Sequence, residues 1–220
     1  MSPSEDTFES PAEQLPAGPR SRKGAQTRVR LLESAQVVFE KAGFLEARIS
    51  DIADSAGLSH GSFYHYFDSK EQIFREVAEE QEARLTAPDN HGASDGPPPS
   101  EYQRIQRATR LYLERYRDNG AIMGVIEEVS RYDSFVNEAR MNRQKHFAER
   151  AEASIRRLQG QGSADADINP EIAAVALGSM VGRFAELWLV EGWGTYDFDT
   201  AAEQLTKLWA NAIGLRHAAT

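Results

Sequence analysis

Polar side chains that can form hydrogen bonds are concentrated in one short stretch, Ser59-His60-Gly61-Ser62-Phe63-Tyr64-His65. If this stretch is helical, small polar residues occupy its first turn, where free backbone N–H groups favour an anion such as phosphate. Hydroxyl, imidazole and phenol groups can also donate hydrogen bonds to phosphates or base edges. The pattern therefore indicates contact with a nucleic acid.

No arrangement of residues indicates an enzyme. The five histidines are His60, His65, His91, His146 and His217, and none belongs to an H-E-x-x-H motif or stands four residues from another. The chain has no cysteine, which excludes a thiol nucleophile, a disulfide and a cysteine-ligated zinc. We expect no catalytic residue, no metal site and no cofactor.

Two short helices joined by a tight turn must position the polar stretch. We predict them over residues 50–56 and 59–66. Gly57 permits the sharp turn, Leu58 fills the angle between the helices, and Ser59 caps the second helix. This is the pattern of a helix-turn-helix.

A longer helix on each side supports this unit. Apolar residues recur at spacings of three and four over residues 26–42, which predicts a helix that ends at Gly43 in a left-handed cap. A further helix is predicted from about residue 69 to 85. Phe63 and Phe67 are expected to hold the second short helix on the first.

The sequence from Gly43 to Phe74 resembles the TetR family of helix-turn-helix transcriptional repressors. The resemblance is carried by Gly43-Phe44, Asp51-Ile52-Ala53, Ala56-Gly57-Leu58-Ser59, Gly61-Ser62-Phe63-Tyr64, Tyr66-Phe67, Ser69-Lys70-Glu71 and Phe74. It implies three DNA-binding helices, a connecting fourth helix and a helical C-terminal body.

The resemblance also implies roles for single residues in the DNA-binding unit. His60, Gly61 and Ser62 would face base edges, Tyr64 and His65 would contact bases or backbone, and Lys70 would reach a phosphate. The family usually has Thr just before the Asp51 helix, where this chain has Ala47 and Arg48. We hypothesise that Arg48 replaces the lost phosphate contact. The predicted DNA-binding set is Arg28, Arg48, Ser59, His60, Gly61, Ser62, Tyr64, His65 and Lys70.

The charge distribution is compatible with DNA binding although the net charge is -9. Arg20, Arg22, Lys23, Arg28 and Arg30 form a local basic cluster in an otherwise acidic chain. Such a cluster can neutralise phosphates. The alternative interpretation of the part from Arg20 to Lys23 is an ordinary solvated tail.

The rest of the chain predicts an all-α protein in three parts. Residues 1–19 are expected to be a disordered tail, residues 20–68 the DNA-binding domain, and residues 69–220 the effector-binding and dimerisation domain. Helices are predicted over residues 102–117, 121–132, 135–158, 170–190 and 200–215, with breaker-rich loops at 86–100 and 159–169.

Dimerisation is assigned to the last two predicted helices. Ala174, Gly178 and Gly182 form a stripe of small residues that allows close helix approach. Leu205, Trp209 and Ala212 lie on one face of the last helix, and together the two helices predict a four-helix dimer interface. The alternative for either stripe is packing inside one subunit.

The effector pocket is predicted from aromatic, Met and Ile residues of the body, for which plain core packing is the alternative. The candidates are Tyr112, Tyr116, Met123, Ile126, Phe135, Met141, Phe147, Phe184 and Trp188, together with Arg183. Arg183 lies in an otherwise apolar helix and needs a partner. That partner is Glu186, Glu127 or Glu128, or else an anionic ligand.

These features predict a cytoplasmic, sequence-specific regulator that binds double-stranded operator DNA as a homodimer and is released by a small hydrophobic or acyl-type effector. The alternatives are a DNA-binding regulator without an effector and a helical adaptor protein. We expect no membrane span, because no run approaches about 20 apolar residues.

Overall fold

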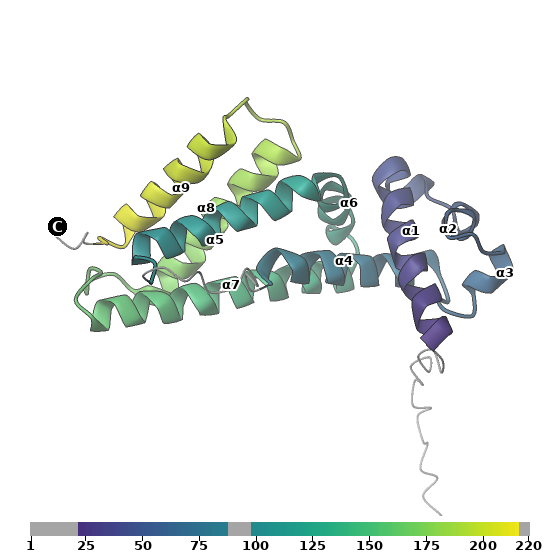
Figure 1. Cartoon of the computed structure of the whole chain (residues 1–220), viewed down its shortest axis with the longest axis horizontal. Coiled ribbons are helices and arrows are strands. Elements are labelled where there is room, and N and C mark those ends of the chain that lie inside the picture. Colours follow the sequence, from purple (N-terminus) through teal and green to yellow (C-terminus); the bar gives the residue numbers. More distant parts are fainter. Residues whose placement is uncertain (1–21, 88–97, 216–220) are drawn as a thin grey trace, which may run out of the picture.

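The computed structural model describes residues 22–87 and 98–215, and all of the regular structure in these two ranges is helical (Figure 1). The helices are α1 Arg22–Glu46, α2 Ile49–Ser55, α3 His60–Phe63, α4 Lys70–Thr86, α5 Glu101–Asp118, α6 Gly120–Ser130, α7 Ser134–Gly160, α8 Pro170–Leu189 and α9 Phe198–Ala212. The all-α prediction is confirmed. The predicted tail 1–19, Arg20 and most of the predicted loop 86–100 lie outside the described residues.

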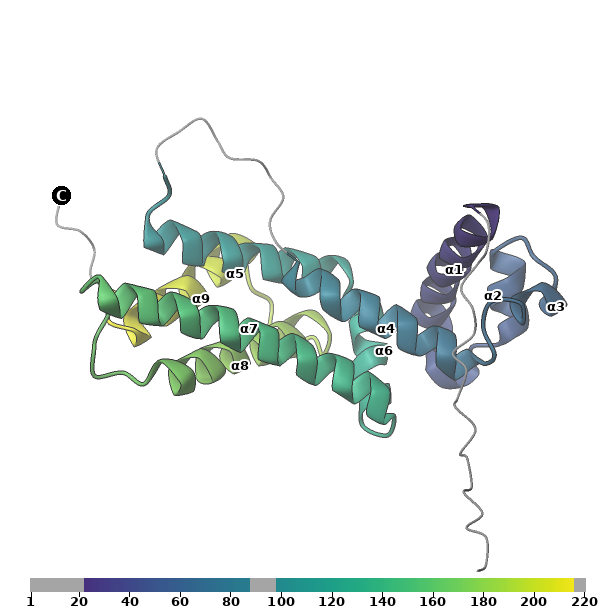
Figure 2. The same cartoon turned by 90° about the horizontal axis from the view of Figure 1, so that it is seen from below.

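Helices α1 to α3 form a small domain at one end of the molecule, and the first turns of α4 complete its core (Figures 1 and 2). The rings of Phe39 and Phe74 meet edge to face with centroids 4.9 Å apart, and Phe44 lies 4.9 Å from Phe74. Such aromatic pairs are favourable beyond the area they bury. The helix-turn-helix is therefore fixed to α4.

The predicted end of the first helix is present as a break inside α1. Gly43 has φ 71° and ψ 173°, a left-handed conformation that a glycine adopts without strain. One further turn, which includes Phe44, follows the break and packs into the core. The break thus directs the chain from α1 toward α2.

The body consists of α5 to α9 and the second half of α4, with α4 lying along α7 (Figure 2). Its core contains Leu113, Ile122, Ile126, Ile155 and Leu158, each almost completely buried. The predicted α8 start is correct, because Pro170 occupies the first turn and the side chain of Asn169 accepts a hydrogen bond from the backbone N–H of Ile172.

One helix bears on the expectation that the chain has no membrane span. Among the described residues, α8 is long and apolar enough to cross a membrane by length and composition alone. It packs against α7 and α5 within the body, and it carries Glu171, Arg183 and Glu186. Core helices of globular proteins pass the same test, so this finding is weak evidence for a span.

Candidate DNA interface and effector cavity

The turn between α2 and α3 has the geometry of a helix-turn-helix. Gly57 has φ 65°, and the N–H of Leu58 bonds to the carbonyl of Ala53 at 2.9 Å. The side chain of Ser59 accepts a hydrogen bond from the N–H of Ser62 at 3.2 Å, so the predicted cap is present. The α-helical part of α3 is four residues long and continues as turns through Tyr66, and is thus shorter than predicted.

The outer surface of α3 presents polar groups over a buried aromatic base. Phe63 and Phe67 are buried, as predicted. His60, Gly61 and His65 are exposed, and the Tyr64 side chain is 48 % exposed with its ring against that of His60. A Cβ added to Gly61 would meet no atom within 4 Å. Packing in this chain therefore does not require glycine at position 61.

Lys70 is positioned differently from the expectation. Its ammonium group donates hydrogen bonds to the carbonyls of Phe44, Leu45 and Ala47 at 2.8, 3.0 and 3.0 Å. It also lies 4.7 Å from the centre of the Phe44 ring. All three ammonium hydrogens thus have acceptors. Lys70 ties the start of α4 to the end of α1 instead of pointing outward toward a phosphate.

The two predicted arginines have different surroundings. Arg28 is half-buried, pairs with Glu76 of α4 and stacks 4.8 Å from the centre of the Phe67 ring, so it joins α1 to the rest of the domain. Arg48 is exposed at the N-cap position of α2, where no side chain caps the helix, while Ala47 is buried. Arg48 therefore remains available for a phosphate contact.

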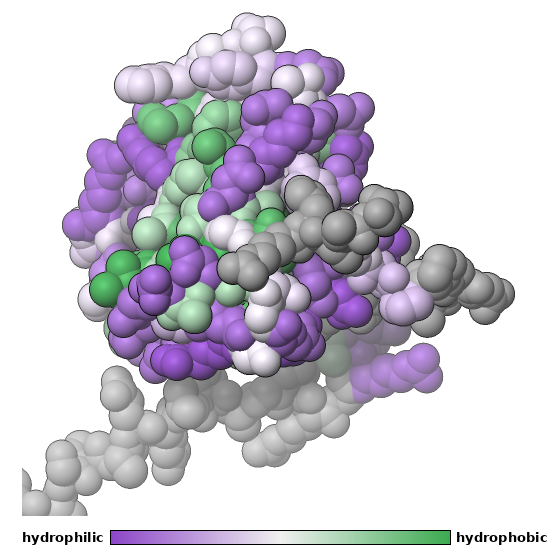
Figure 3. Space-filling model, turned by 90° about the vertical axis from the view of Figure 1, so that its left-hand side faces the viewer, coloured by the Kyte–Doolittle hydropathy of each residue, from purple (hydrophilic) through white to green (hydrophobic). Residues whose placement is uncertain are grey.

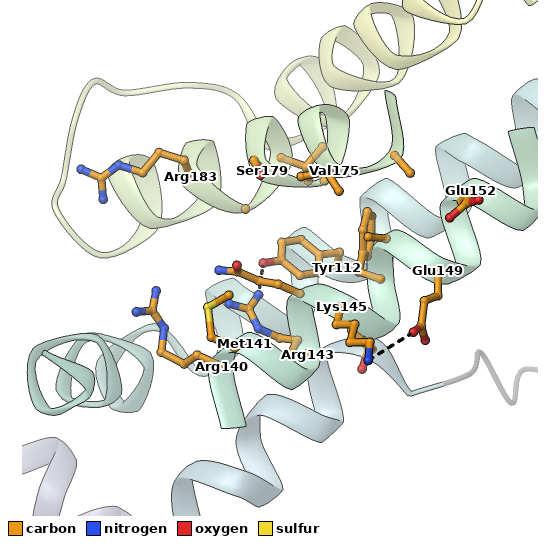
Figure 4. Close-up of a pocket in the computed structure, with 18 of the residues that line it drawn as sticks. Tyr112, Arg140, Met141, Arg143, Lys145, Glu149, Glu152, Val175, Ser179 and Arg183 are labelled. Atoms are coloured by element: carbon orange, nitrogen blue, oxygen red, sulfur yellow. Dashed lines mark hydrogen bonds and ion pairs between the residues drawn. The ribbon is translucent and has the colours of Figure 1, made fainter. Parts of the chain in front are cut away.

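A cavity of about 610 Å³ lies between α7 and α8 above α5 (Figure 4). The predicted residues Tyr112, Tyr116, Met141 and Phe147 line it. Arg183 lies at the rim and points away from Tyr112. Its guanidinium pairs with Glu186 at 2.5 Å and with Glu191 at 3.1 Å. The interpretation of Arg183 as part of an ion pair with Glu186 is therefore correct.

Other predicted pocket residues lie elsewhere. Met123 and Ile126 are buried in the body core on α6. Phe135 is exposed and covered on one face by Arg75. Trp188 belongs to a separate aromatic cluster with Phe184, Tyr196 and Phe198. None of these residues is among those that line the cavity.

The residues that sequence reasoning missed are charged and buried beside the cavity. Glu82 of α4 pairs with Arg143 of α7, whose side chain is only 9 % exposed. Arg143 also donates a hydrogen bond to the Tyr112 hydroxyl at 2.6 Å (Figure 4). Arg140 pairs with Glu127 and lies 3.9 Å from Glu82. The spacing of Glu82 in the sequence could have indicated its burial. Glu82 stands four residues after Ala78, so the two lie on the same face of α4, and Ala78 is buried.

Burial dominates the electrostatics of this network. Removal from solvent raises the pKa of Glu82, although the nearby Arg143 and Arg140 oppose the change. Burial likewise raises the pKa of Tyr112 and Tyr116, so both phenols are neutral hydrogen-bonding groups at neutral pH. The inner wall of the cavity therefore combines neutral hydroxyls with a guanidinium that is already paired.

Helix α4 connects this network to the DNA-binding domain. Toward α1 it is held by Lys70, by the Arg28–Glu76 pair and by Gln81, whose side-chain amide donates to Gln36 at 2.9 Å. Toward α7 it is held by Glu82 and by Arg75, which pairs with Asp133 at 2.8 Å. A displacement of α4 against α7 must therefore also act on α1.

The predicted small-residue stripe faces the interior of the subunit. A Cβ added to Gly178 would lie 2.8 Å from the Phe147 ring, and one added to Gly182 would lie 3.6 Å from the Tyr112 hydroxyl. Ala174 is completely buried. The stripe thus packs inside the subunit, which is the alternative given above, because the glycines allow α8 to approach α7 and α5.

The predicted face of α9 is also mostly internal. Leu205 and Trp209 are buried within the subunit against α5, whereas Ala212 is exposed. The large apolar side chains exposed on the last two helices are Ile172 (68 %), Val175 (54 %) and Leu208 (54 %). Figure 3 shows hydrophobic residues gathered on the end of the body that lies away from α1–α3.

The fold and these sites define a class of protein, a two-part helical protein with an N-terminal helix-turn-helix and a helical body that contains a cavity. The family described as bacterial regulatory proteins, tetR family, matches residues 31–77. The matched residues comprise α2, α3 and the adjoining parts of α1 and α4, so the helix-turn-helix is similar to that of this family. Within residues 22–87 and 98–215, no group of three or more His, Asp or Glu side chains could hold a metal ion.

Curated relatives match about a third of the chain. The HTH-type transcriptional regulator YdgC of Bacillus subtilis is 43 % identical over 63 residues, which is 29 % of this chain and 32 % of that protein. The HTH-type transcriptional repressor KstR2 of Mycolicibacterium smegmatis is 42 % identical over 66 residues, 30 % of each chain. The matches thus span about a third of these relatives' own length.

The whole fold has a counterpart among solved structures. A putative transcriptional regulator from Saccharomonospora viridis, determined in complex with choline, superposes with a TM-score of 0.71. The match covers 88 % of this chain and 100 % of that one at 20 % identity. At this identity the likeness confirms the fold, with a helix-turn-helix domain followed by a larger helical body.

Proposed function

We propose that this protein is a cytoplasmic transcriptional repressor that binds operator DNA as a homodimer and is released by a small effector. The observation that carries the proposal is the exposed polar surface of α3, held rigidly by the buried rings of Phe63 and Phe67. The family match over residues 31–77 and the regulators among the relatives support it. Those relatives are regulators rather than enzymes, and no catalytic role is proposed here.

The DNA contacts are assigned to the exposed groups of the helix-turn-helix. His60 and Gly61 enter the major groove with the start of α3, while Tyr64 and His65 contact bases or backbone. Arg48 contacts a phosphate through its charge. Ser59 and Ser62 bond to each other and shape the helix start (Oγ to Oγ, 2.7 Å).

The dimer forms through the outward faces of α8 and α9, where Ile172, Val175 and Leu208 are exposed. A two-fold axis there pairs the same surface of two subunits. The two copies of α3 then enter successive major grooves about 34 Å apart, which calls for a nearly palindromic operator.

The effector occupies the cavity between α7 and α8. Its volume of about 610 Å³ suits a small molecule, and its inner wall is aromatic. Tyr112 and Arg143 meet there and offer one polar anchor. We assign to it a small, largely apolar or acyl-type ligand whose single polar group bonds to this pair.

Release is transmitted by the Arg143–Glu82 pair. A ligand that binds Arg143 or moves Tyr112 weakens the ion pair between Arg143 of α7 and Glu82 of α4. Helix α4 can then shift against α7. Because α4 is tied to α1 through Lys70 and Glu76, this shift also moves the DNA-binding domain. The distance between the two copies of α3 in the dimer then changes. To convert the population from 1:99 to 99:1, the ligand must favour the released state by about 5.5 kcal/mol.

The test is selection from a random double-stranded DNA library over several rounds at two salt concentrations. We expect an enriched palindrome whose affinity falls steeply with salt and is lost in Tyr64→Ala. The matched control is Tyr132→Ala, an equally exposed tyrosine outside the DNA-binding domain, which should bind normally. Absence of enrichment at either salt, with no small molecule copurified, would contradict the proposal and favour a helical adaptor.

A further inference from the structure

A second cavity, of about 510 Å³, lies on the other side of the wall that bounds the first. It is enclosed by the end of α4 and by α5, α7, α8 and α9. Tyr112 and Phe147 line both cavities and so form the partition between them. The two spaces therefore share a wall.

The inside of the second cavity is apolar, and its charged lining is of one sign. Leu85, Leu111, Val181 and Trp209 form part of its apolar surface. The charged side chains that line it are Arg104, Arg107, Arg115 and Arg150, and no carboxylate appears among the described lining residues. The first cavity differs, because four arginine or lysine side chains there are matched by four glutamates.

Two of these arginines are not neutralised by a carboxylate in the described part of the chain. Arg107 is exposed on α5 and has neither an ion pair nor a hydrogen bond there. Arg150 donates to the backbone carbonyl of Thr86 at 2.8 Å, a neutral acceptor. A third, Arg104, lies 3.7 Å from Glu101, but that carboxylate already receives two hydrogen bonds from Arg157.

We propose that the second cavity binds an anionic amphiphile, with a carboxylate or phosphate head at Arg107 and Arg150 and an apolar chain against Leu85, Leu111 and Trp209. Guanidinium groups match both kinds of head geometrically, and each charge-assisted hydrogen bond is worth more than a neutral one. A cationic or uncharged head gains nothing from this opening. The site is distinct from the effector cavity, and the proposal does not depend on DNA binding.

The experiment measures binding of four ligands with the same twelve-carbon chain to the full-length protein by calorimetry. The ligands are dodecanoate, dodecyl phosphate, dodecanol and dodecyltrimethylammonium, each below its micelle concentration. We expect the two anions to bind at least about tenfold more tightly than the alcohol, and the cation to bind weakest. Equal affinities for the alcohol and the anions would overturn the proposal.

Two pairs of variants locate the site. Ala151 lines the second cavity and Ala148 the first, one turn apart on α7, so Ala148→Phe, which blocks the first cavity, should retain anion binding, and Ala148→Phe/Ala151→Phe should lose it. Arg107→Glu should weaken binding at least about tenfold, whereas Arg131→Glu, an equal charge change at an exposed residue that lines neither cavity, should have little effect. The arginine pair tests the site even if a phenylalanine variant misfolds. Retained binding in Arg107→Glu, or equal losses in both glutamate variants, would refute it.

Discussion

Arg143 on α7 and Glu82 on α4 form an ion pair that is almost closed to solvent, with the two side chains 9 % and 2 % exposed. The same guanidinium bonds to the Tyr112 hydroxyl in the cavity wall. One side chain thus touches both the proposed effector site and the helix that carries the DNA-binding domain. The stability and the regulation of the protein should therefore depend on the same pair.

Removal of one partner should be far more harmful than removal of both. Arg143→Met leaves Glu82 buried beside only the more distant Arg140, and we expect a loss of roughly 3–5 kcal/mol in the free energy of unfolding. The double variant Glu82→Gln/Arg143→Met should regain most of this loss. Urea unfolding followed by circular dichroism measures all three proteins.

The matched control is Arg156→Met, which removes a solvent-exposed arginine from its pair with Glu152 on the same helix. Exposed pairs of this kind are worth about 0.3–0.5 kcal/mol. If Arg143→Met were no more harmful than Arg156→Met, the buried pair would not hold α4 on α7.

The raised pKa of Glu82 predicts a stability that depends on pH. Between the ordinary glutamate pKa of 4.5 and the raised value in the folded state, the folded protein keeps a proton that the unfolded chain has lost. The contribution of this group is therefore full below pH 4.5 and is lost as the pH rises through the folded-state pKa. Relative to Glu82→Gln, the wild-type protein should lose stability over this window and then level off.

Urea unfolding of both proteins at a series of pH values measures the difference directly. The comparison cancels the titration of other groups, such as Asp133, whose pKa is lowered because its hydrogen bonds from Arg75 and from backbone N–H groups outweigh burial. A difference that rises with pH would mean that the carboxylate, not the acid, is favoured in the folded state.

The substitution Gly61→Ala should weaken DNA binding without lowering the stability of the protein. A methyl group at this position meets no atom in the protein, and alanine is favoured over glycine in a helix by up to about 1 kcal/mol. Gly61→Ala should thus be at least as stable as the wild type but bind operator DNA more weakly, because the added methyl group obstructs close approach to the groove. Thermal unfolding and DNA titration test the two statements.

Gly160→Ala provides the control, since Gly160 is also helical and unobstructed but lies at the end of α7. It should stabilise the protein and leave DNA binding unchanged. Full DNA affinity in Gly61→Ala would remove position 61 from the interface.

The local patterns of the sequence predicted local structure well. The turn at Gly57, the cap at Ser59 and the buried ring of Phe63 depend on residues a few positions apart, so their spacing alone specifies them. Pro170 marked the start of α8 for the same reason. Each of these predictions concerns contacts within one helix or one turn.

Predictions about which helices face each other were less successful. The stripe containing Gly178 does allow close helix approach, but the partner is Phe147 of the same subunit. Periodicity shows that a helix has an apolar face without showing what covers it. The ion pair between Glu82 and Arg143 joins residues 61 positions apart, a relationship that the spacing within either helix cannot reveal.

Lys70 and Arg48 should differ in their effect on DNA binding. The Lys70 ammonium already bonds to three carbonyls, so Lys70→Met should lower stability by about 1–3 kcal/mol while the slope of log affinity against log salt stays unchanged. Arg48→Met should leave stability unchanged and reduce that slope by about one phosphate contact. DNA titrations at several salt concentrations measure the slopes.

Lys41→Met serves as the control for the loss of a positive charge at an exposed position of α1. It should alter stability within about 0.5 kcal/mol. A reduced salt slope in Lys70→Met would show that Lys70 leaves the α1 carbonyls and reaches a phosphate when DNA is bound.

The outward faces of α8 and α9 should decide the oligomeric state. Val175 and Leu208 are more than half exposed in the single chain, and a dimer that buries them cannot accommodate an unpaired charge there at low cost. Val175→Glu/Leu208→Glu should therefore be a folded monomer in sedimentation equilibrium. Val37→Glu, at an equally exposed valine on α1, should remain a dimer. Because a monomer presents one copy of α3, the double variant should also lose its preference for a two-half-site operator over a single half-site. A double variant that still sediments as a dimer would place the interface on another surface, whereas a monomer that still prefers the palindrome would separate operator recognition from this interface.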